Sequence, residues 1–348
     1  MKRYFSVEIL RFLTSLSVLL YHYRHFFDPL NILSDNDYEI VKFKLPFYNF
    51  IDWLYSYGFY GVHVFYTISG FVFAHVYLSS KKNTSFKEFS INRVARLYPL
   101  HFATLLFVAL SQFLYFTNYG DFQFKYFNDL YHFFLQLFFI SSWGFESGHS
   151  FNAPIWSVSV EIGIYILFFC LIKILKKYQL KLLIFVSVIL ILIDKSKIFD
   201  TLFLECARLF FSGSIIYFLI SYNTKKIIFM ILSLLLLGFS FMGNFKTFLF
   251  CPSLLLFFLS FEDFIKRENI KNSFSFLGNL TYGLYLLHVP YQLSIIYLFD
   301  ILSIKINLFN NAIFFFAYFL SLGFIASIVF SLYEKPLNKI IRKRLLNV

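Results

Sequence analysis

Long apolar runs, separated by short polar segments, extend along the whole chain. A helix needs about 20 apolar residues to cross a membrane, and ten runs approach or exceed this length. They span 5–27, 54–79, 97–118, 155–174, 180–194, 202–221, 226–243, 246–261, 276–298 and 311–333. The pattern therefore predicts an all-α polytopic membrane protein with about ten transmembrane helices.

An eleventh apolar run, 127–142, is interpreted from the charges between the other runs. If those ten runs cross and both termini are cytoplasmic, 21 of the 31 Lys and Arg residues fall on the cytoplasmic side and 8 on the outer side. This bias agrees with the positive-inside rule. If 127–142 also crossed, all loops on one side of it would move to the opposite face of the membrane. We therefore expect cytoplasmic N- and C-termini, with 127–142 as a re-entrant or interfacial outer segment.

The composition fits a membrane domain, since 59% of the residues are hydrophobic and only 14% are charged. The net charge of +12 does not indicate nucleic-acid binding, because the basic residues lie between the predicted spans. Cys170, Cys206 and Cys251 lie in apolar segments without the spacing of metal ligands. We expect them to be small buried hydrophobic residues and expect no metal site. No linker or repeat divides the chain, which predicts one transmembrane domain over 1–348.

The first run carries two ionisable residues, Arg11 and His22. Eleven helical residues place them about 20° apart around the helix and about 16 Å apart along it, so they share one stripe. Ionisable groups in a membrane span are costly and are functional candidates by default. The alternatives are a structural arginine and an interfacial histidine. Histidine, with a pKa near neutral, is the usual proton acceptor for an attacking hydroxyl.

Arg93 and Arg96 lie three residues apart, on one face of a helical turn just before the predicted span 97–118. They are either a topology anchor or a clamp for phosphates, whose oxygens match the guanidinium fork. Pro99 is expected near the start of that span, where proline is tolerated.

Glu161 lies inside the span that begins near 155, an expensive place for an acid without a partner. Arg208 lies on the same face of a later span as Glu205, and a pair between the two is the alternative to a functional role. His288 precedes a proline in mid-span. Further candidate neighbours of a site are His63, Ser157, Ser159 and Tyr165. For each of these residues, helix packing or a local hydrogen bond is the alternative to a functional role.

Several motifs together resemble the acyltransferase-3 family of integral-membrane O-acyltransferases. They run in family order along nearly the whole chain: Arg11-x10-His22, Gly61-Val62 with Ile68-Ser69-Gly70-Phe71, Arg93-x-x-Arg96-Leu-Tyr-Pro99, Trp156-Ser-Val-Ser-Val-Glu161, Arg208 with Phe211 and Gly213, Tyr282-Gly-Leu-Tyr-Leu-Leu-His288-x-Pro290, and Glu334-Lys-Pro336.

The resemblance implies ten transmembrane helices in a bacterial inner membrane and an acyl-CoA donor, usually acetyl-CoA. The acyl group would pass to a hydroxyl of a polysaccharide or a lipid-linked oligosaccharide. Essential roles are implied for Arg11, His22, Arg93 and Arg96. We expect His22 to be the general base or a transient acyl carrier, Arg11 to position the donor or organise the core, and Glu161 to orient His22.

Two other functions fit parts of the pattern. A polytopic bundle with buried charges also suits a transporter or flippase of a glycan precursor, although the chain shows no inverted repeat. A structural partner in a glycan-assembly complex is the third hypothesis. The largest outer segments, 28–53 and 119–153, combine acidic and aromatic residues. Such segments are either plain connectors or sugar-binding surfaces.

Overall fold

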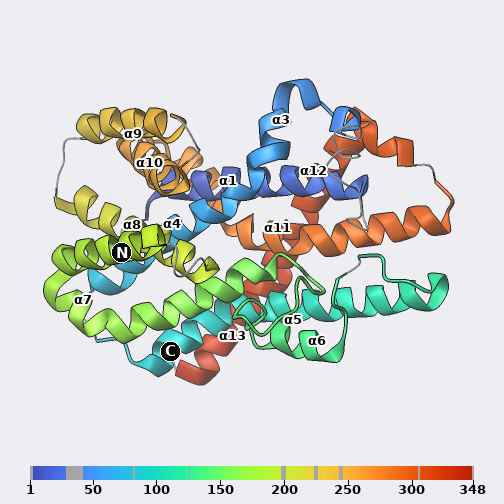
Figure 1. Ribbon diagram of the computed structural model, residues 1–348, viewed down its shortest axis with the longest axis horizontal. Coiled ribbons are helices and arrows are strands. Elements are labelled where there is room, and N and C mark those ends of the chain that lie inside the picture. The colour runs from blue at the N-terminus through green and yellow to red at the C-terminus, as the bar shows by residue number, and fades with distance from the viewer. Residues whose placement is uncertain are drawn as a thin grey trace. The chain divides into compact units, whose positions relative to one another are not determined.

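The computed structural model describes residues 3–28, 42–80, 83–124, 126–196, 201–222, 226–242, 246–304 and 306–346. It is all-helical, with 84% helix and no strand in these ranges (Figure 1). The main helices are α1 (Phe5–Tyr23), α3 (Tyr48–Tyr57), α4 (Gly61–Phe73), α5 (Phe86–Tyr119), α6 (Leu130–Leu137), α7 (Ile155–Ser196), α8 (Leu202–Tyr222), α9 (Lys226–Ser240), α10 (Thr247–Ser260), α11 (Glu268–Ile301), α12 (Ala312–Val329) and α13 (Lys335–Leu346).

All ten apolar runs predicted from the sequence are helical where the structure describes them. Eight helical segments are long and apolar enough to cross a membrane. The runs 155–174 and 180–194 share one of these, α7, which is interrupted at Gln179 with φ 44°. The run 226–243 forms α9, which has only 15 residues. The structure thus confirms an all-helical membrane protein, while the count of ten crossings and the cytoplasmic termini stay predictions.

The run 127–142 contains only the short helix α6, of 8 residues. The Asp129 side chain caps its start by accepting a hydrogen bond from the His132 backbone N–H at 2.9 Å. Eight residues extend only about 12 Å, far less than a bilayer core. The segment therefore does not cross as a helix, in agreement with the sequence-based prediction.

The chain divides into two compact units, and α1, α7 and α11 each contribute to both. Unit 1 comprises Met1–Thr14, Tyr60–Phe86 and Val160–Asn279. Its helices α4 and α8 pack backbone to backbone, because a Cβ at Gly70 would lie 1.7 Å from the Phe210 carbonyl oxygen. Glycine is therefore required at this crossing, as at many membrane helix contacts.

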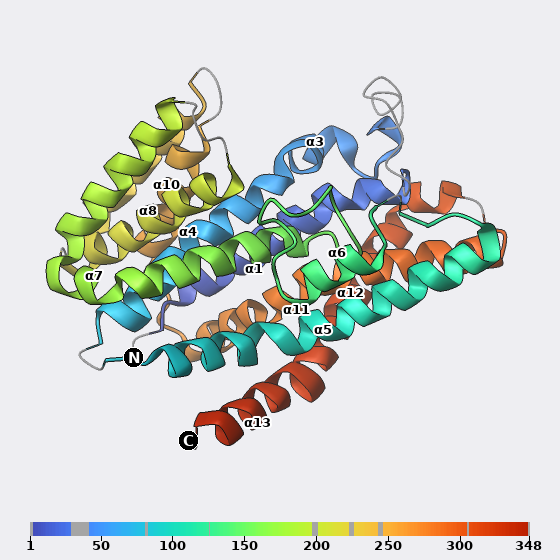
Figure 2. The same ribbon diagram turned by 60° about the horizontal axis from the view of Figure 1, so that its bottom comes forward.

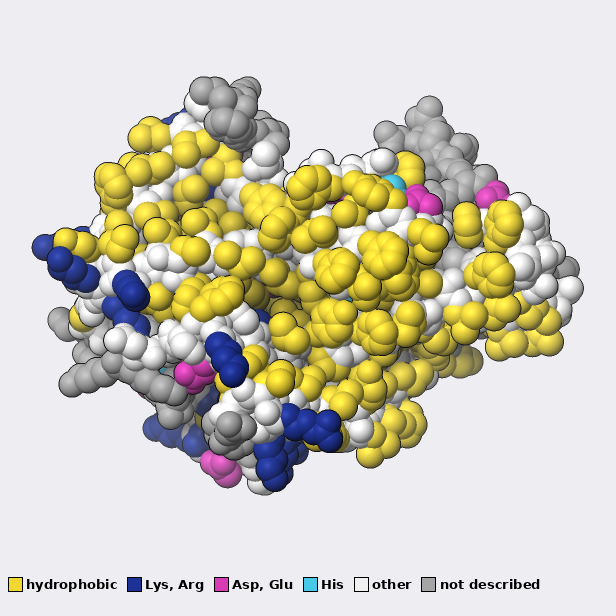
Figure 3. Space-filling model, turned by 90° about the horizontal axis from the view of Figure 1, so that it is seen from below, with side chains coloured by type: hydrophobic (Ala, Val, Ile, Leu, Met, Phe, Trp, Pro, Cys, Tyr) yellow, Lys and Arg dark blue, Asp and Glu magenta, His cyan; other side chains and the backbone are white. Residues whose placement is uncertain are grey.

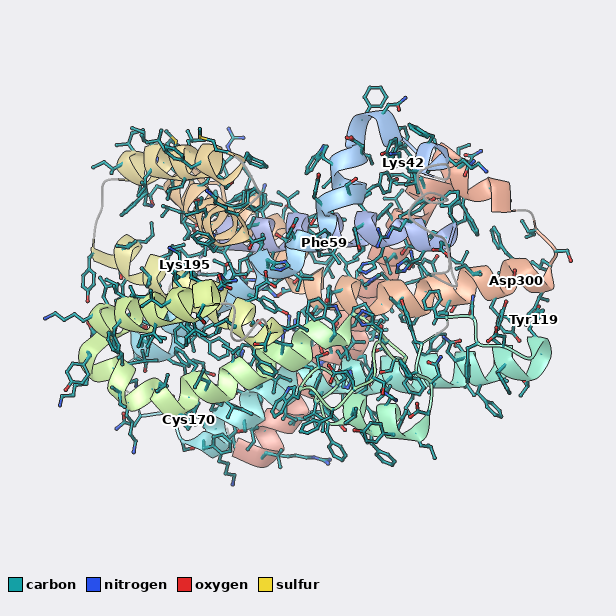
Figure 4. All side chains as sticks on the ribbon, in the orientation of Figure 1. Lys42, Phe59, Tyr119, Cys170, Lys195 and Asp300 are labelled. Carbon is teal, nitrogen blue, oxygen red and sulfur yellow. The ribbon has the colours of Figure 1, made fainter. Side chains whose placement is uncertain are left out.

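Unit 2 comprises Ser15–Phe59, Lys87–Ser159 and Leu280–Val348. Within it α5 and α11 lie side by side (Figure 2). A buried core joins residues of α5 and α11 to the loop residues around α6: Leu105, Val108, Phe124, Phe151, Val289 and Leu293. At the far ends of the two helices, Tyr115 donates a hydrogen bond to Asp300 at 3.1 Å, near the labelled Tyr119 (Figure 4).

Proline interrupts the hydrogen bonding of α5. The helix begins at Phe86, so Pro99 lies inside it rather than near its start. Proline has no N–H, and the carbonyl four residues earlier loses its helical donor. That carbonyl belongs to Ala95, and the Asn338 side chain of α13 donates to it at 3.0 Å. This contact ties the start of α13 to α5.

The surface is strongly apolar. Hydrophobic side chains cover much of the face shown in Figure 3, and Lys and Arg gather toward one side of it. Phe113 and Leu320 are examples of large apolar residues exposed on α5 and α12. Exposed apolar area of this kind is typical of a membrane-facing surface.

The cysteine prediction holds in part. Cys206 and Cys251 are buried, but Cys170 is exposed on α7 (Figure 4). Of the outer segment 28–53, residues 29–41 lie outside the described residues, as do Lys2, Lys81, Lys82, Lys125, Lys197, Lys225 and Lys305 of the charge count.

The predicted topology can be tested at Phe134, which is exposed on α6. In a Cys170→Ala background, Phe134→Cys is expected to react with a membrane-impermeant thiol reagent added outside intact cells. Lys87 is exposed near the start of α5, and Lys87→Cys is the matched control. It is expected to react only after the cells are broken, so that the reagent reaches the cytoplasmic face of the membrane. Labelling of Phe134→Cys only after opening would contradict the topology.

Candidate active site

His22 lies in the last turn of α1, where it is partly exposed. Its Nδ1 lies 3.0 Å from the Val18 carbonyl oxygen one turn earlier. A carbonyl can only accept, so Nδ1 carries the proton in this contact and Nε2 keeps its lone pair. The imidazole is therefore held as the tautomer that accepts a proton at Nε2.

A second imidazole lies beside His22. The ring centroid of His288, from α11, is 4.8 Å from that of His22. His288 is fully buried, and its Nδ1 lies 2.7 Å from the Tyr285 carbonyl oxygen. The ring centroid of His25 lies 5.1 Å from that of His22. Unit 2 thus gathers three histidines at the end of α1.

Gln292 fixes the end of α1 to α11. Its Nε2 donates to the His22 carbonyl oxygen at 3.0 Å. Carbonyls in the last turn of a helix have no helical donor, so this side chain satisfies one of them. The backbone and the imidazole of His22 are therefore both held by hydrogen bonds.

Pro290 weakens α11 next to His288, and Asn152 compensates. The proline removes the donor for the Leu286 carbonyl, and Asn152 Nδ2 donates to that oxygen at 3.1 Å. The neighbouring Tyr285 hydroxyl donates to the Pro154 carbonyl at 2.9 Å. The segment that leads into α7 therefore holds α11 at the turn that carries His288.

The two serines predicted as site neighbours also fasten this segment. Ser157 Oγ lies 2.7 Å from the Tyr285 hydroxyl, so it belongs to the support of His288. Ser159 Oγ accepts from the Ser142 N–H at 3.2 Å, and its carbonyl accepts from Trp143 Nε1 at 3.0 Å. Ser159 therefore holds the loop after α6.

Arg96 belongs to a separate charged cluster of unit 2. Its Nη1 lies 3.8 Å from Glu334 Oε2, which is an ion pair without a hydrogen bond. The guanidinium lies 5.8 Å from the ring centroid of Tyr282, whose hydroxyl donates to the Leu97 carbonyl at 2.7 Å. Glu334 is buried at the end of a π-helical turn, Phe330–Glu334. Such turns are frequent at functional sites.

Arg93 lies one turn before Arg96 on α5 and is partly buried. Gly283 lets Glu334 come close to α11, because a Cβ there would lie 3.1 Å from Glu334 Oε1. Three helical segments therefore meet at Arg96: α5, α11 and the end of α12.

Arg11 lies in unit 1 and has a carboxylate partner. Its Nη1 lies 3.1 Å from Glu8 Oε2, and Arg3 lies 3.1 Å from the other oxygen of Glu8. Gly278 leaves room for this carboxylate, because a Cβ there would lie 2.0 Å from it. The structure confirms that Arg11 and His22 lie on one continuous helix.

The alternative of a pair between Glu205 and Arg208 is wrong. Glu205 Oε1 lies 2.9 Å from Nε2 of the buried His63, and Arg208 pairs with Asp194. In unit 1, Glu205 contacts a residue of α4 and Arg208 pairs with a residue of α7. Each of these residues of α8 therefore has its partner on a different helix. His63 thus contacts Glu205 where α4 packs against α8.

Tyr165 and Glu161 lie on α7 in unit 1. Tyr165 stacks on Phe73, with ring centroids 4.2 Å apart, and its hydroxyl lies 3.5 Å from Ser69 Oγ. The role of Glu161 in orienting His22 stays a prediction. No group of three or more His, Cys, Asp or Glu residues with a metal-binding arrangement occurs in the described ranges.

Sequence patterns did not single out three residues of this site: His25, Gln292 and Asn152. Tyr285 and Glu334 occur in the family motifs, but the sequence assigned neither of them a role. Pro290 carries a signal, because a proline inside a membrane helix requires a donor for the carbonyl four residues earlier. The sequence does not say that Asn152, 134 residues before Leu286, supplies that donor.

Together, the long apolar helices and a histidine centre inside them define a multi-pass membrane protein with a polar site. A family model described as "Acyltransferase domain" matches residues 4–332 of the 348. The chain therefore belongs to the acyltransferase-3 family, as the motifs predicted, and is a membrane acyltransferase. No curated protein and no solved structure matches it.

The support of His288 predicts a specific coupling between Asn152 and Pro290. Asn152→Leu leaves the Leu286 carbonyl without a donor and should destabilise the protein by about 1–3 kcal/mol. Pro290→Ala restores the missing N–H, so Asn152→Leu should cost less in that background. Thermal unfolding of the four proteins in detergent measures this cycle. Strictly additive effects would contradict the account.

Proposed function

We propose that this protein transfers an acetyl group from acetyl-CoA to a hydroxyl of a cell-surface or lipid-linked polysaccharide at a bacterial inner membrane. The observation that carries the proposal is the state of His22. Its Nδ1 is committed to the Val18 carbonyl, and Nε2 is left as an acceptor on a partly exposed ring. Membership of an acyltransferase family supports the reaction class.

The proposed step uses His22 as a general base. The acceptor hydroxyl gives its proton to Nε2 while its oxygen forms a bond to the acetyl carbonyl carbon. The bond from that carbon to the CoA sulfur then breaks, and the proton passes to the departing thiolate. In the second version of the mechanism, Nε2 itself carries the acetyl group between the two substrates. Both versions need the tautomer that the Val18 contact supports.

Arg93 and Arg96 are proposed to bind the phosphates of the donor. Arg96 is held near Tyr282 and Glu334, and its 3.8 Å contact with the carboxylate is too long for a hydrogen bond. Charge-assisted hydrogen bonds to phosphate are shorter, about 2.7–2.9 Å, and stronger. Glu334 then acts as the counter-charge of Arg96 when no donor is bound.

Arg11 is proposed to position the donor or to organise the core of the first helix. Its pairing with Glu8 supports the second of these roles.

Substitution of His22 should abolish the transfer. His22→Ala and His22→Gln are each expected to lower acetylation of the surface glycan at least about 100-fold, because general-base catalysis supplies a factor of this size or more. Mass spectrometry of glycan from cells, at matched protein level, gives both the acyl mass and the sugar that carries it.

The matched control is His101→Gln, which replaces another fully buried histidine of unit 2 that contacts Gln136 instead. This variant should keep the acetyl group on the glycan. Full acetylation with His22→Ala would show that His22 is neither the general base nor the acyl carrier. A transporter would be favoured if cells without the protein carried less surface glycan and the remaining glycan had the same mass as in wild-type cells.

The arginine pair should act on donor affinity. Arg93→Ala with Arg96→Ala is expected to raise the KM for acetyl-CoA at least about tenfold, since hydrogen bonds to charged groups contribute about 1.5–3 kcal/mol each. Lys87→Ala, near the start of the same helix, is the control for general loss of positive charge. An unchanged KM would return the pair to the role of a topology anchor.

A further inference from the structure

Two fully buried polar side chains lie one turn apart on α11, directly beside His22. His288 and Gln292 have no exposed surface. Each uses a donor on a backbone carbonyl: His288 Nδ1 on Tyr285, and Gln292 Nε2 on His22. The atoms that remain, His288 Nε2 and Gln292 Oε1, have no hydrogen-bond partner among the described residues.

Both remaining atoms are acceptors, and so is Nε2 of His22. The neighbourhood therefore presents several acceptors beside one remaining donor, the second N–H of Gln292. A buried polar atom without a partner costs about 1–3 kcal/mol. Only a molecule that brings hydrogen-bond donors can satisfy these atoms.

The acceptors are uncharged, which favours neutral donors such as hydroxyl groups over cations. The rings of His22 and His288 have centroids 4.8 Å apart. Hydrogen bonds of ordinary length, about 2.7–3.2 Å, can therefore reach from both rings to one small molecule. Two neighbouring hydroxyls on a sugar ring supply two donors at such a spacing.

We propose that His288, with Gln292 beside it, binds the hydroxyl next to the one that is acylated, so that the acceptor is a vicinal diol. This inference rests on the proposed acyl transfer at His22. The reactive hydroxyl meets His22, and its neighbour donates to His288 Nε2. His288 is then a specificity residue that selects and orients the acceptor.

The test compares two small acceptors with the purified full-length protein and acetyl-CoA: trans-cyclohexane-1,2-diol and cyclohexanol. Ester formation is measured by mass spectrometry. The wild-type protein should favour the diol about tenfold in kcat/KM, the factor given by one additional hydrogen bond. His288→Leu should lose this preference, so that its kcat/KM with the diol is no higher than with cyclohexanol.

Two further variants separate binding from packing. His288→Gln restores an acceptor oxygen and should recover part of the preference for the diol. His101→Leu removes a fully buried histidine elsewhere in unit 2, and it should leave the preference unchanged. Equal rates with both alcohols in the wild-type protein would overturn the proposal. So would a parallel loss on both alcohols in His288→Leu.

Failure of the proposed function looks different: neither alcohol nor the glycan is acetylated. If the glycan is acetylated but the small alcohols are not, the wild-type protein and His288→Leu are compared with the glycan as acceptor. His288→Leu must then lower glycan acetylation by about tenfold more than it lowers hydrolysis of acetyl-CoA by water. Equal loss of both reactions overturns the inference.

Discussion

A backbone carbonyl inside a membrane helix must find a donor, and this requirement organises the site. Pro290 and Pro99 each remove one N–H from a long helix. Asn152 supplies the donor for Leu286, and Asn338 supplies it for Ala95. The first contact holds the turn of α11 that carries His288. The second holds α13 against the turn of α5 that carries Arg96. In both places the structural repair and the functional side chain lie within a few residues.

The same rule explains the state of the histidines. The Nδ1 atoms of His22 and His288 are committed to backbone carbonyls, so each ring offers only Nε2 to a ligand. An imidazole held in this way keeps one tautomer, with Nε2 as its acceptor. Gln292 adds a third constraint, because it joins the carbonyl of His22 to the helix of His288. Preorganisation of this kind is what efficient proton transfer requires.

Local patterns predicted much of this protein. The apolar runs predicted the helices, and the spacing of Arg11 and His22 placed both on one helix. The run 127–142, which was not predicted to cross, holds only the short helix α6. Contacts between distant segments were not predictable. His288 lies 266 residues after His22, and nothing in the local sequence indicates that the rings meet. Glu205 and Arg208 illustrate the same limit, since their spacing favours a pair but partners on neighbouring helices bind them instead.

The central claim is that His22 passes an acetyl group from acetyl-CoA to a sugar hydroxyl. Its most direct test uses purified protein, acetyl-CoA with a labelled acetyl group, and surface glycan from which esters have been removed. The account predicts labelled ester on the glycan, with one CoA thiol released for each ester, and no ester above background with His22→Gln. Ester formation by His22→Gln at the wild-type rate would contradict it, as would a wild-type protein that releases no CoA.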